Sequence, residues 1–423
     1  MALWRAPQQH RNREASLSES PASNSPKALE GVRVLDLGTL FAGPCIATFL
    51  GEFGADVIKV EQTGVGDPLR TWGAEHPGHS PIWAQEARNK KAVTCDLRQP
   101  EGQDLIRKLV AHCDVVVENY RPGTLERWGI GYDDLKAVRP DVILVRATGY
   151  GQTGPYASKP GFARVGQGFG GLTYLAGEPG GPPLTPGSTT LSDYITPIFG
   201  AFGTMLALRH RDRTGQGQVV DVALYETTFR LLDTITVDYS NRGIIRDRTG
   251  RAGAPYAAPH GQFPSKDGGW IALACTGDRM WQRFCKAVGR EDLATDERFS
   301  TLEPRLANRV ELDAIVDSIT SQYNREDLLA MFDREEVAAG PVNNIEDIFN
   351  DPHYWAREML IKVTDPVYGE LVMPGVVPKL SETPGTVEEL GPPVLGQHNH
   401  DIYGGLLGLS DETLDGLKAK GVI

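Results

Sequence analysis

Apolar residues in the first 150 positions form short, nearly continuous runs that are separated by stretches with helical spacing. Runs such as DVVVEN and DVILVR are typical of strands that are buried on both faces of a sheet. Strands that alternate with helices are joined by right-handed crossovers and form a mostly parallel sheet. The pattern therefore predicts an α/β region, with strands at 32–37, 56–60, 92–97, 115–118 and 142–147 and helices at 44–54, 101–112 and 124–128.

The residue composition and the hydrophobic pattern of the chain change twice after this region. From about residue 229 the sequence becomes rich in Arg and Gly, and from about residue 340 an α/β-like pattern returns. Between these points a smaller unit is predicted, with a strand at 270–275, a helix at 279–288 and amphipathic helices at 311–323 and 325–336. Residues 1–27 are rich in Ser, Pro and Asn near their end, and we expect a disordered tail there.

Composition narrows the possible functions. A formal charge of −12 over 423 residues disfavours a general nucleic-acid binder, which needs clustered Lys and Arg. The five cysteines are scattered and show no CxxC pattern, so neither a disulfide framework nor a zinc site is expected. No apolar run is expected to reach the length of a membrane span, and the first residues lack the apolar stretch of a secretory signal. We therefore expect a cytoplasmic protein that does not bind membranes.

The segments that leave the strands are where a ligand is expected in such a sheet. The first turn, from Gly38 to Gly43, is not GxGxxG, so a dinucleotide cofactor is not supported. Arg98, Arg121 and Arg127 lie near exits of adjacent strands, and Arg binds phosphate through a planar fork. We expect these residues to converge on a multiply phosphorylated ligand. The pair His398 and His400 lacks a supporting carboxylate pattern and is not predicted to bind a metal.

Asp193 is the candidate nucleophile. It lies between a Gly/Ser/Thr loop at 187–190 and an apolar helical stretch that starts near Ile195. A carboxylate in that position would be partly dehydrated and held in place. The alternative from these residues alone is that Asp193 only caps the helix, because Asp accepts hydrogen bonds from the first amide groups of a helix.

A resemblance to a known family is carried by many ordered blocks of the sequence. The chain resembles the class III CoA-transferase family, which includes formyl-CoA transferase, carnitine CoA-transferase and α-methylacyl-CoA racemase. Within it, the dicarboxylate-type enzymes, such as succinyl-CoA:L-malate CoA-transferase subunits, are the most similar. The blocks are LEGVRVLDLG, AGPCIATFLGEFGADVIKVE, GDPLRTWG, RNKKAVTCDLRQPEG, CDVVVENYRPGTLERWGIGY, TGYGQTGPY, GLTYLAGEPGGPP, RTGQGQVVDVALYE, GPVNNIEDIFNDPH and PPVLGQHNHDI.

The resemblance implies a fold that the pattern alone does not give. It implies a Rossmann-like large CoA-binding domain from both chain ends, a smaller inserted α+β domain and two chains interlocked as a dimer. On this chain the divisions fall at 28–228 for the first part of the large domain, 229–340 for the small domain and 341–423 for the return. The partner would be a second copy or a related subunit in a hetero-oligomer.

The resemblance also assigns residues. The family's catalytic aspartate falls on Asp193, and its CoA-contacting positions fall on Arg98, Asn119 and Arg127, with Lys90 nearby. From its place directly after a strand, Asn119 is also a candidate to bind an adenine or a pantetheine amide. No metal or tightly bound cofactor is implied, because a CoA thioester is the substrate. The implied reaction moves CoA from an acyl-CoA, most simply succinyl-CoA, to a dicarboxylate such as malate or citramalate through an aspartyl-CoA thioester.

Departures from the family pattern bear on the substrate. Racemase members need a histidine where this chain has Phe162, so the alternative of an α-methylacyl-CoA racemase is disfavoured. Ala163 replaces a common acid, which leaves open a non-catalytic CoA-binding subunit of a heteromeric transferase. Phe41 replaces a glutamine of formyl-CoA transferase and predicts a drier pocket. We expect Phe41, Ala163 and the adjacent Arg164 to contact the acceptor, with Arg164 holding its distal carboxylate.

Overall fold

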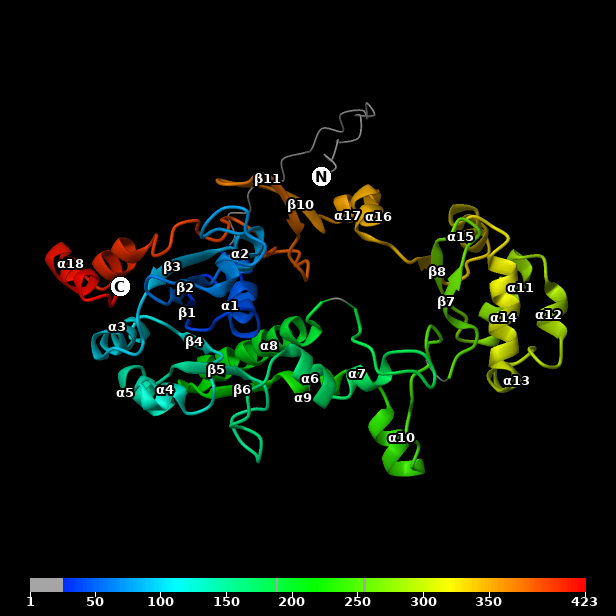
Figure 1. Ribbon diagram of the computed structural model, residues 1–423, viewed down its shortest axis with the longest axis horizontal. Helices are drawn as coiled ribbons and strands as arrows, with labels where there is room; N and C mark the ends of the chain where they lie inside the picture. The colour runs from blue at the N-terminus through cyan, green and yellow to red at the C-terminus, as the bar shows by residue number, and fades with distance from the viewer. Residues whose placement is uncertain (1–25, 188, 254–255) are drawn as a thin grey trace.

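A six-stranded parallel sheet forms the centre of one end of the molecule (Figure 1). The computed structural model describes residues 26–187, 189–253 and 256–423, so the expected tail lies outside the described residues except for its last two positions, as does Ser188 of the loop before Asp193. The strand order is β3-β2-β1-β4-β5-β6, which is the doubly wound order with a reversal between β1 and β4. The strands are β1 (Arg33–Asp36), β2 (Asp56–Glu61), β3 (Lys90–Thr94), β4 (Val115–Glu118), β5 (Ile143–Thr148) and β6 (Val219–Ala223).

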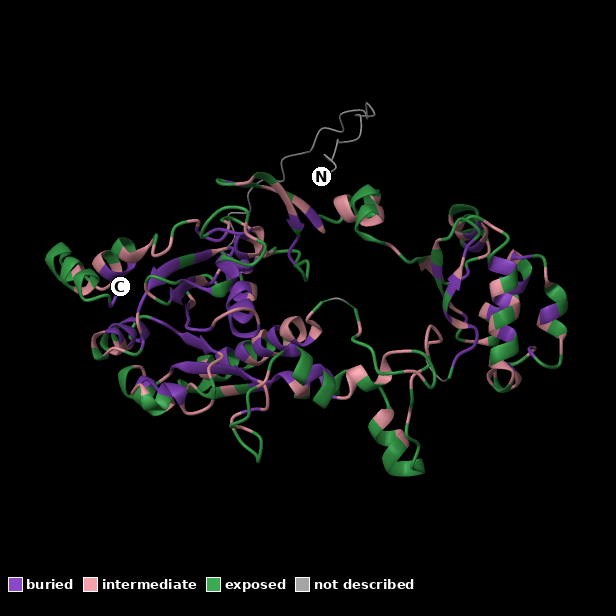
Figure 2. Cartoon of the chain, viewed as in Figure 1, coloured by how far each residue is buried: buried purple, intermediate pink, exposed green. Residues whose placement is uncertain are grey.

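Both faces of this sheet are covered, and its strands are mostly buried (Figure 2). Consecutive residues point to opposite faces, so Val34 belongs to the core under α1 and α8, while Leu35 belongs to the core under α3 and α5. The two helices of the first face are α1 (Ala42–Glu52) and α8 (Leu191–Thr214), and those of the second are α3 (Pro100–Val110) and α5 (Tyr132–Val138). Shorter helices of this region are a 3-10 turn (Pro68–Arg70), α2 (Pro81–Glu86), α4 (Thr124–Arg127), α6 (Ala163–Phe169), α7 (Leu172–Leu175), α9 (Leu224–Arg230) and α10 (Ile235–Arg242).

The C-terminal segment returns to the sheet. His398 donates its backbone N–H to the carbonyl of Ala92 at 3.0 Å, and the Tyr403 hydroxyl donates to the carbonyl of Thr94 at 2.9 Å. Residues from both ends of the chain therefore share one core. The returning elements are α16 (Ile345–Asn350), α17 (Pro352–Ala356), the hairpin β10 (Leu360–Asp365) and β11 (Gly369–Pro374), a π-helical segment (His400–Leu406) and α18 (Asp411–Ala419).

The middle of the chain builds a second, separate core. Its buried residues run from Ala258 to Val337 and are packed around Trp281 and Phe284, whose rings stack at 5.3 Å. This unit lies at the far end of an elongated molecule, joined to the large sheet by the segment that contains α10 and by the segment between β9 and α16 (Figure 1). Its elements are β7 (His260–Pro264), β8 (Trp270–Ala274), α11 (Asp278–Ala287), α12 (Glu291–Thr295), α13 (Leu302–Ala307), α14 (Arg309–Thr320), α15 (Arg325–Arg334) and β9 (Ala339–Pro341).

Two expectations from the sequence are corrected here. The third strand runs from Lys90 to Thr94 rather than from 92 to 97, because pairing with β2 already begins at Lys90, opposite Val57. The Lys90 ammonium is buried there in an ion pair with Asp36 at 2.9 Å. The expectation that no apolar run is long enough to cross a membrane is wrong for α8, whose 24 residues pass that test by length and hydropathy. One face of this helix packs against α1, α9 and strands β5 and β6.

Candidate active site

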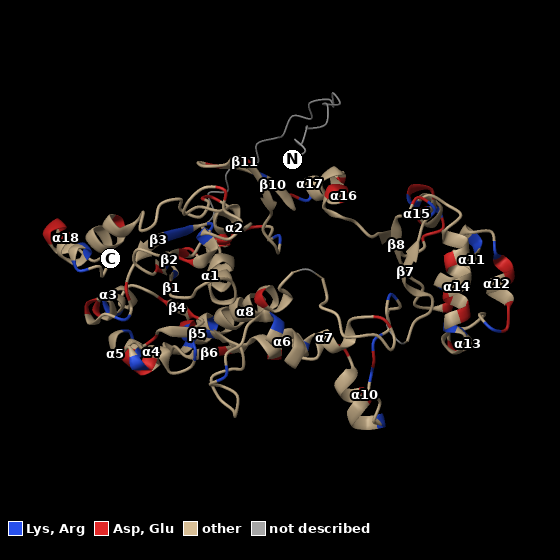
Figure 3. Cartoon of the chain, viewed as in Figure 1, with Lys and Arg blue, Asp and Glu red and all other residues tan. Residues whose placement is uncertain are grey.

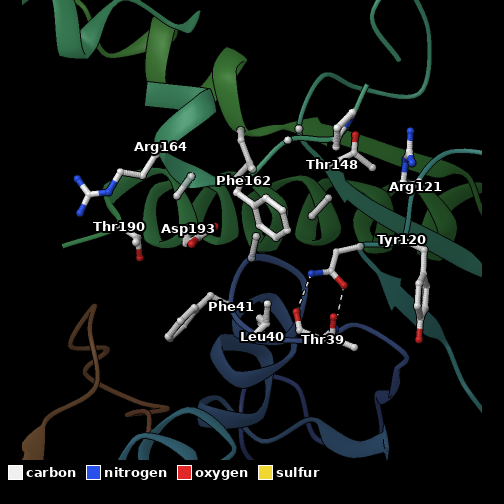
Figure 4. Close-up of a pocket in the computed structure, with 18 of the residues that line it drawn as sticks. Thr39, Leu40, Phe41, Tyr120, Arg121, Thr148, Phe162, Arg164, Thr190 and Asp193 are labelled. Carbon is white, nitrogen blue, oxygen red and sulfur yellow. Dashed lines mark hydrogen bonds between the residues drawn. The ribbon is translucent and has the colours of Figure 1, made fainter. Parts of the chain in front are cut away.

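A cavity of about 740 Å³ opens at the carboxyl ends of the parallel strands, where the strand order reverses. Such switch points are where open α/β sheets bind ligands. The turn after β1, the loop after β4 and the loop after β5 form three of its walls, and the starts of α6 and α8 close it (Figure 4). The cavity therefore combines residues that are far apart in the sequence.

Asp193 lies in this cavity, in the first turn of α8. The helix starts at Leu191 and its N-cap is Thr190, so the alternative that Asp193 is the cap is wrong. Burial raises the pKa of Asp193 to about 6, and the Thr190 side chain opposes the shift in part. The carboxylate is thus mostly ionised at neutral pH but poorly solvated. A dehydrated, fixed carboxylate is suited to nucleophilic attack on an acyl group.

Aromatic side chains form the wall beside Asp193. The ring of Phe41 lies 5.6 Å from that of Tyr194 and 5.9 Å from that of Trp72, and Phe41 and Trp72 line the cavity. The hydroxyl of Tyr194 donates to the buried carboxylate of Glu86 at 3.1 Å. This hydrogen bond holds the Tyr194 ring in place against Phe41. The sequence pointed to Phe41 but not to Trp72 or Tyr194, since their proximity depends on the folded loops.

The start of α6 faces the nucleophile from the other side. Phe162 is the N-cap of this helix and is 68% exposed, while the next residue, Ala163, is buried. Arg164 is exposed, lines the cavity and forms no hydrogen bond or ion pair with any residue within the described ranges. Its guanidinium is consequently available to an anionic ligand.

Two further cations, Arg121 and Lys159, line the cavity at the exits of β4 and β5. Figure 4 shows Arg121 on the opposite side of Asp193 from Arg164. Arg121 donates to the backbone carbonyl of Ser158 and so joins the two exit loops. Lys159, which sequence reasoning missed, has its Nζ 3.5 Å from the ring centroid of Tyr156. A signal for Lys159 was present in its position in the polar loop after the fifth strand.

The predicted CoA-contacting residues are dispersed. Asn119 lines the cavity, but its side-chain amide is hydrogen-bonded to the backbone of Thr39. Lys90 is buried, with its Nζ 2.7 Å from the carbonyl of Pro44, and does not line the cavity. The guanidinium of Arg98 is 64% exposed and bound to Asp96.

Arg127 is exposed on α4, and its side chain donates to the Thr124 hydroxyl at 3.0 Å, outside the lining of the cavity. The CoA roles of Lys90, Arg98 and Arg127 therefore remain predictions. The structure shows no contact between these side chains and the cavity.

Comparisons with known proteins agree with one another. The model of CoA-transferase family III matches residues 29–399. The chain is 46% identical over 397 residues to the succinyl-CoA–L-malate CoA-transferase beta subunit of Chloroflexus aurantiacus, covering 93% of this chain and 98% of the relative. It is 44% identical over 399 residues to the succinyl-CoA–D-citramalate CoA-transferase of the same organism, covering 94% and 98%. The crystal structure of a CAIB/BAIF family protein from Brucella suis matches with a TM-score of 0.79 at 35% identity, covering 90% of this chain and 100% of that chain.

Proposed function

The chain belongs to CoA-transferase family III, and on this premise we propose that it moves CoA from succinyl-CoA to a dicarboxylate acceptor such as malate or citramalate. The observation that carries the proposal is the position of Asp193, a poorly solvated carboxylate between Arg164 on one side and Arg121 on the other, in a cavity that Lys159 also lines. A ligand with phosphates at one end and a carboxylate at the other suits this charge distribution.

In the proposed reaction, a carboxylate oxygen of Asp193 attacks the thioester carbonyl carbon of succinyl-CoA. The C–S bond breaks, CoA leaves as the thiolate, and an aspartyl-succinyl anhydride remains. The thiolate then attacks the aspartyl carbonyl of this anhydride, which releases succinate and leaves CoA bound to Asp193 as a thioester. No proton is consumed, because the pair of electrons that leaves with sulfur returns with it.

The acceptor repeats the steps in the reverse order. One of its carboxylates attacks the aspartyl-CoA thioester, CoA leaves again as the thiolate, and an anhydride between the acceptor and Asp193 forms. Attack of the thiolate on the acceptor carbonyl gives the new acyl-CoA and restores the free carboxylate of Asp193. Each step passes through a tetrahedral oxyanion, so its stabilisation sets the rate.

Backbone N–H groups at the start of α1 are suited to hold that oxyanion. The N–H groups of Phe41, Ala42 and Gly43 have no partner in the chain as described, and Phe41 and Ala42 line the cavity with Asp193. The first N–H groups of a helix lack intrahelical acceptors and carry partial positive charge. They therefore offer fixed donors to a developing negative charge.

Arg164 is proposed to hold the distal carboxylate of the acceptor. Ala163, which stands where an acid is common in the family, adds no negative charge beside it. The racemase alternative lacks the usual second base, since among the described lining residues Asp193 is the only carboxylate and none is histidine. Proton exchange at the α-carbon would have to use Lys159 as its second base, whereas transfer through a covalent aspartyl species needs Asp193 alone.

We also propose that the chain works with a second copy or a related subunit, interlocked as the family resemblance implies. Figure 3 shows α8 with few charges except near its ends. Ile198, Phe202 and Leu206 on this helix are 58%, 60% and 55% exposed, and an apolar groove of about 780 Å³ runs between α8 and the segment after β11. An exposed apolar patch of this kind marks a protein interface. In this assembly, residues 28–228 and 341–423 form the large domain and 229–340 the small one.

A substrate panel tests the proposal. Purified protein is given succinyl-CoA with malate, citramalate, glutarate or butyrate, and each new CoA thioester is identified by mass. Malyl- or citramalyl-CoA is expected, with CoA conserved and no free thiol accumulating. Net hydrolysis to CoA, or deuterium incorporation at the α-carbon without transfer, contradicts the proposal.

A further inference from the structure

The turn between β1 and α1 is held by side chains from several elements. Asp36 accepts the backbone N–H of Gly38 at 3.0 Å, and the buried ammonium of Lys59 donates to the Gly38 carbonyl. Asp67 accepts the N–H of Leu40 at 3.2 Å and pairs with Lys59 at 3.3 Å. All three of these side chains are buried. The path of this turn is thus imposed from outside the turn.

Asn119 supplies the remaining contacts to the turn. Its Oδ1 accepts the N–H of Thr39 at 2.8 Å, and its Nδ2 donates to the carbonyl of Thr39 at 2.7 Å (Figure 4). The neighbouring glycines make room for it, because a Cβ atom at Gly43 would lie 3.1 Å from the Asn119 Cβ, and one at Gly38 would lie 3.1 Å from its Oδ1. Both amide functions of Asn119 are therefore engaged by Thr39, across the strand-order reversal between β1 and β4.

The hydrogen bonds from other elements hold this turn in a backbone conformation that it would otherwise avoid. Leu40 adopts a φ of 61°, a left-handed conformation that is unfavourable for a side chain with a Cβ atom. This conformation directs the chain into α1, whose first N–H groups, at Phe41 and Ala42, remain open at the cavity. Figure 4 shows Thr39, Leu40 and Phe41 facing Asp193 across the site. The strained turn thus sets where those donors lie relative to the nucleophile.

We propose that Asn119 is a positioning residue of the transfer reaction, whose side chain acts by fixing the N–H groups of Phe41 and Ala42 for the oxyanion rather than by adding affinity for CoA. The inference rests on the proposed function, since it needs a tetrahedral oxyanion beside Asp193. It differs from the role that the family resemblance implies for this position. A displacement of about 1 Å in catalytic groups costs about 10²-fold in rate. Loss of the two hydrogen bonds between Asn119 and Thr39, called the clamp below, should therefore lower kcat rather than the affinity for CoA.

The experiment uses Asn119→Ala and Asn119→Ser, which remove the clamp without adding a charge. The dissociation constant of CoA is measured by calorimetry, and kcat is measured with succinyl-CoA and malate. We expect kcat to fall by about 10²-fold while the dissociation constant stays within about twofold. A tenfold weaker affinity for CoA, or an unchanged kcat, overturns the inference. If the Ala variant does not fold, the Ser variant decides.

A matched control is Asn399→Ala. This residue makes the same kind of reciprocal contact elsewhere, accepting the N–H of Thr94 at 2.9 Å and donating to the Thr94 hydroxyl at 2.8 Å. Its loss is expected to leave kcat within about twofold, which separates clamping at the site from a general loss of stability. A loss of kcat in Asn399→Ala equal to that in the Asn119 variants also overturns the inference.

The inference and the proposed function fail in different ways. Covalent trapping of Asp193 in the wild-type enzyme tests the proposed function alone. If trapping succeeds and the Asn119 variants keep their kcat, only the positioning role is lost. If trapping fails at Asp193, the proposed function falls, whatever the variants do.

Discussion

The hydroxyl of Tyr194, the residue directly after Asp193, donates a hydrogen bond of 3.1 Å to the carboxylate of Glu86. Glu86 is buried and also accepts from the Gln85 amide at 2.8 Å and from the Cys45 thiol at 3.2 Å. Burial of the phenol, and after it the neighbouring Glu86 carboxylate, raise the pKa of Tyr194, so the phenol remains a donor. This contact ties the start of α8 to α2, behind the aromatic wall of the cavity.

Removal of this hydroxyl is expected to weaken the protein. Tyr194→Phe should lower the free energy of unfolding by about 1–2 kcal/mol, since one hydrogen bond to a charged, buried acceptor is lost. Urea unfolding of the two proteins at neutral pH measures the difference. Tyr239→Phe is the control, because the Tyr239 side chain is 62% exposed and should change stability little. Equal stability of wild type and Tyr194→Phe would show that the contact does not form.

The pH dependence of the rate should report Asp193. Its pKa is raised to about 6 by burial, and only the ionised form is a nucleophile. Below pH 6 the protonated fraction grows, so kcat/KM should fall by about tenfold per pH unit, and above pH 7 it should level off. Initial rates from pH 4.5 to 8 with succinyl-CoA check this. An acid limb centred near pH 4, the ordinary value for Asp, would show that burial does not perturb the carboxylate in the working enzyme.

Arg164 should select dicarboxylates. Wild-type enzyme is expected to use succinate or malate at least about tenfold better in kcat/KM than butyrate, because a charged hydrogen bond is worth about 1.5–3 kcal/mol. Arg164→Gln should remove most of this preference while changing the KM for succinyl-CoA less. Arg279→Gln is the matched control, since Arg279 is an exposed, unpaired Arg of α11 within the described residues. Equal use of butyrate and succinate by the wild type would refute the role.

Arg121 should bind the CoA portion of the substrate. Arg121→Ala is expected to raise the KM for succinyl-CoA by roughly tenfold with a smaller change in kcat, since a phosphate contact acts equally in the ground and transition states. Arg98→Ala should have a smaller effect, because Arg98 is exposed and bound to Asp96 away from the cavity. An unchanged KM in Arg121→Ala, measured at saturating acceptor, would place CoA elsewhere.

The parallel sheet could be predicted from the sequence, and so could the position of Asp193 at the start of a long helix. Buried strands such as β4 and β5 are nearly uniform in apolar residues, which makes them recognisable without neighbours. The strand β6 was missed because it lies at the edge and exposes Val219 and Asp221. Its assignment depends on pairing with β5, at Leu144 opposite Val219, and this pairing is set by tertiary structure.

The details of the site could not be predicted from local patterns. From the sequence, Lys90 would be expected on the surface. It can be buried because its ammonium pairs with the carboxylate of Asp36, 54 positions earlier. Asn119 follows a strand and reads as a free polar side chain, yet Thr39 takes up both ends of its amide. Each outcome depends on a partner that only the fold brings close. Residue type and strand position predicted a cavity at the strand exits, but not the partner of each side chain.

Covalent trapping of Asp193 tests the central claim most directly. The enzyme is incubated with succinyl-CoA without acceptor and then with hydroxylamine, which converts an activated aspartyl carbonyl to a hydroxamate, and the peptides are analysed by mass. We predict a hydroxamate on Asp193 in the wild type, none in Asp193→Ala, and loss of transfer in that variant with CoA affinity retained. Normal turnover by Asp193→Ala, or a hydroxamate on a different residue of the wild-type enzyme, would contradict the account.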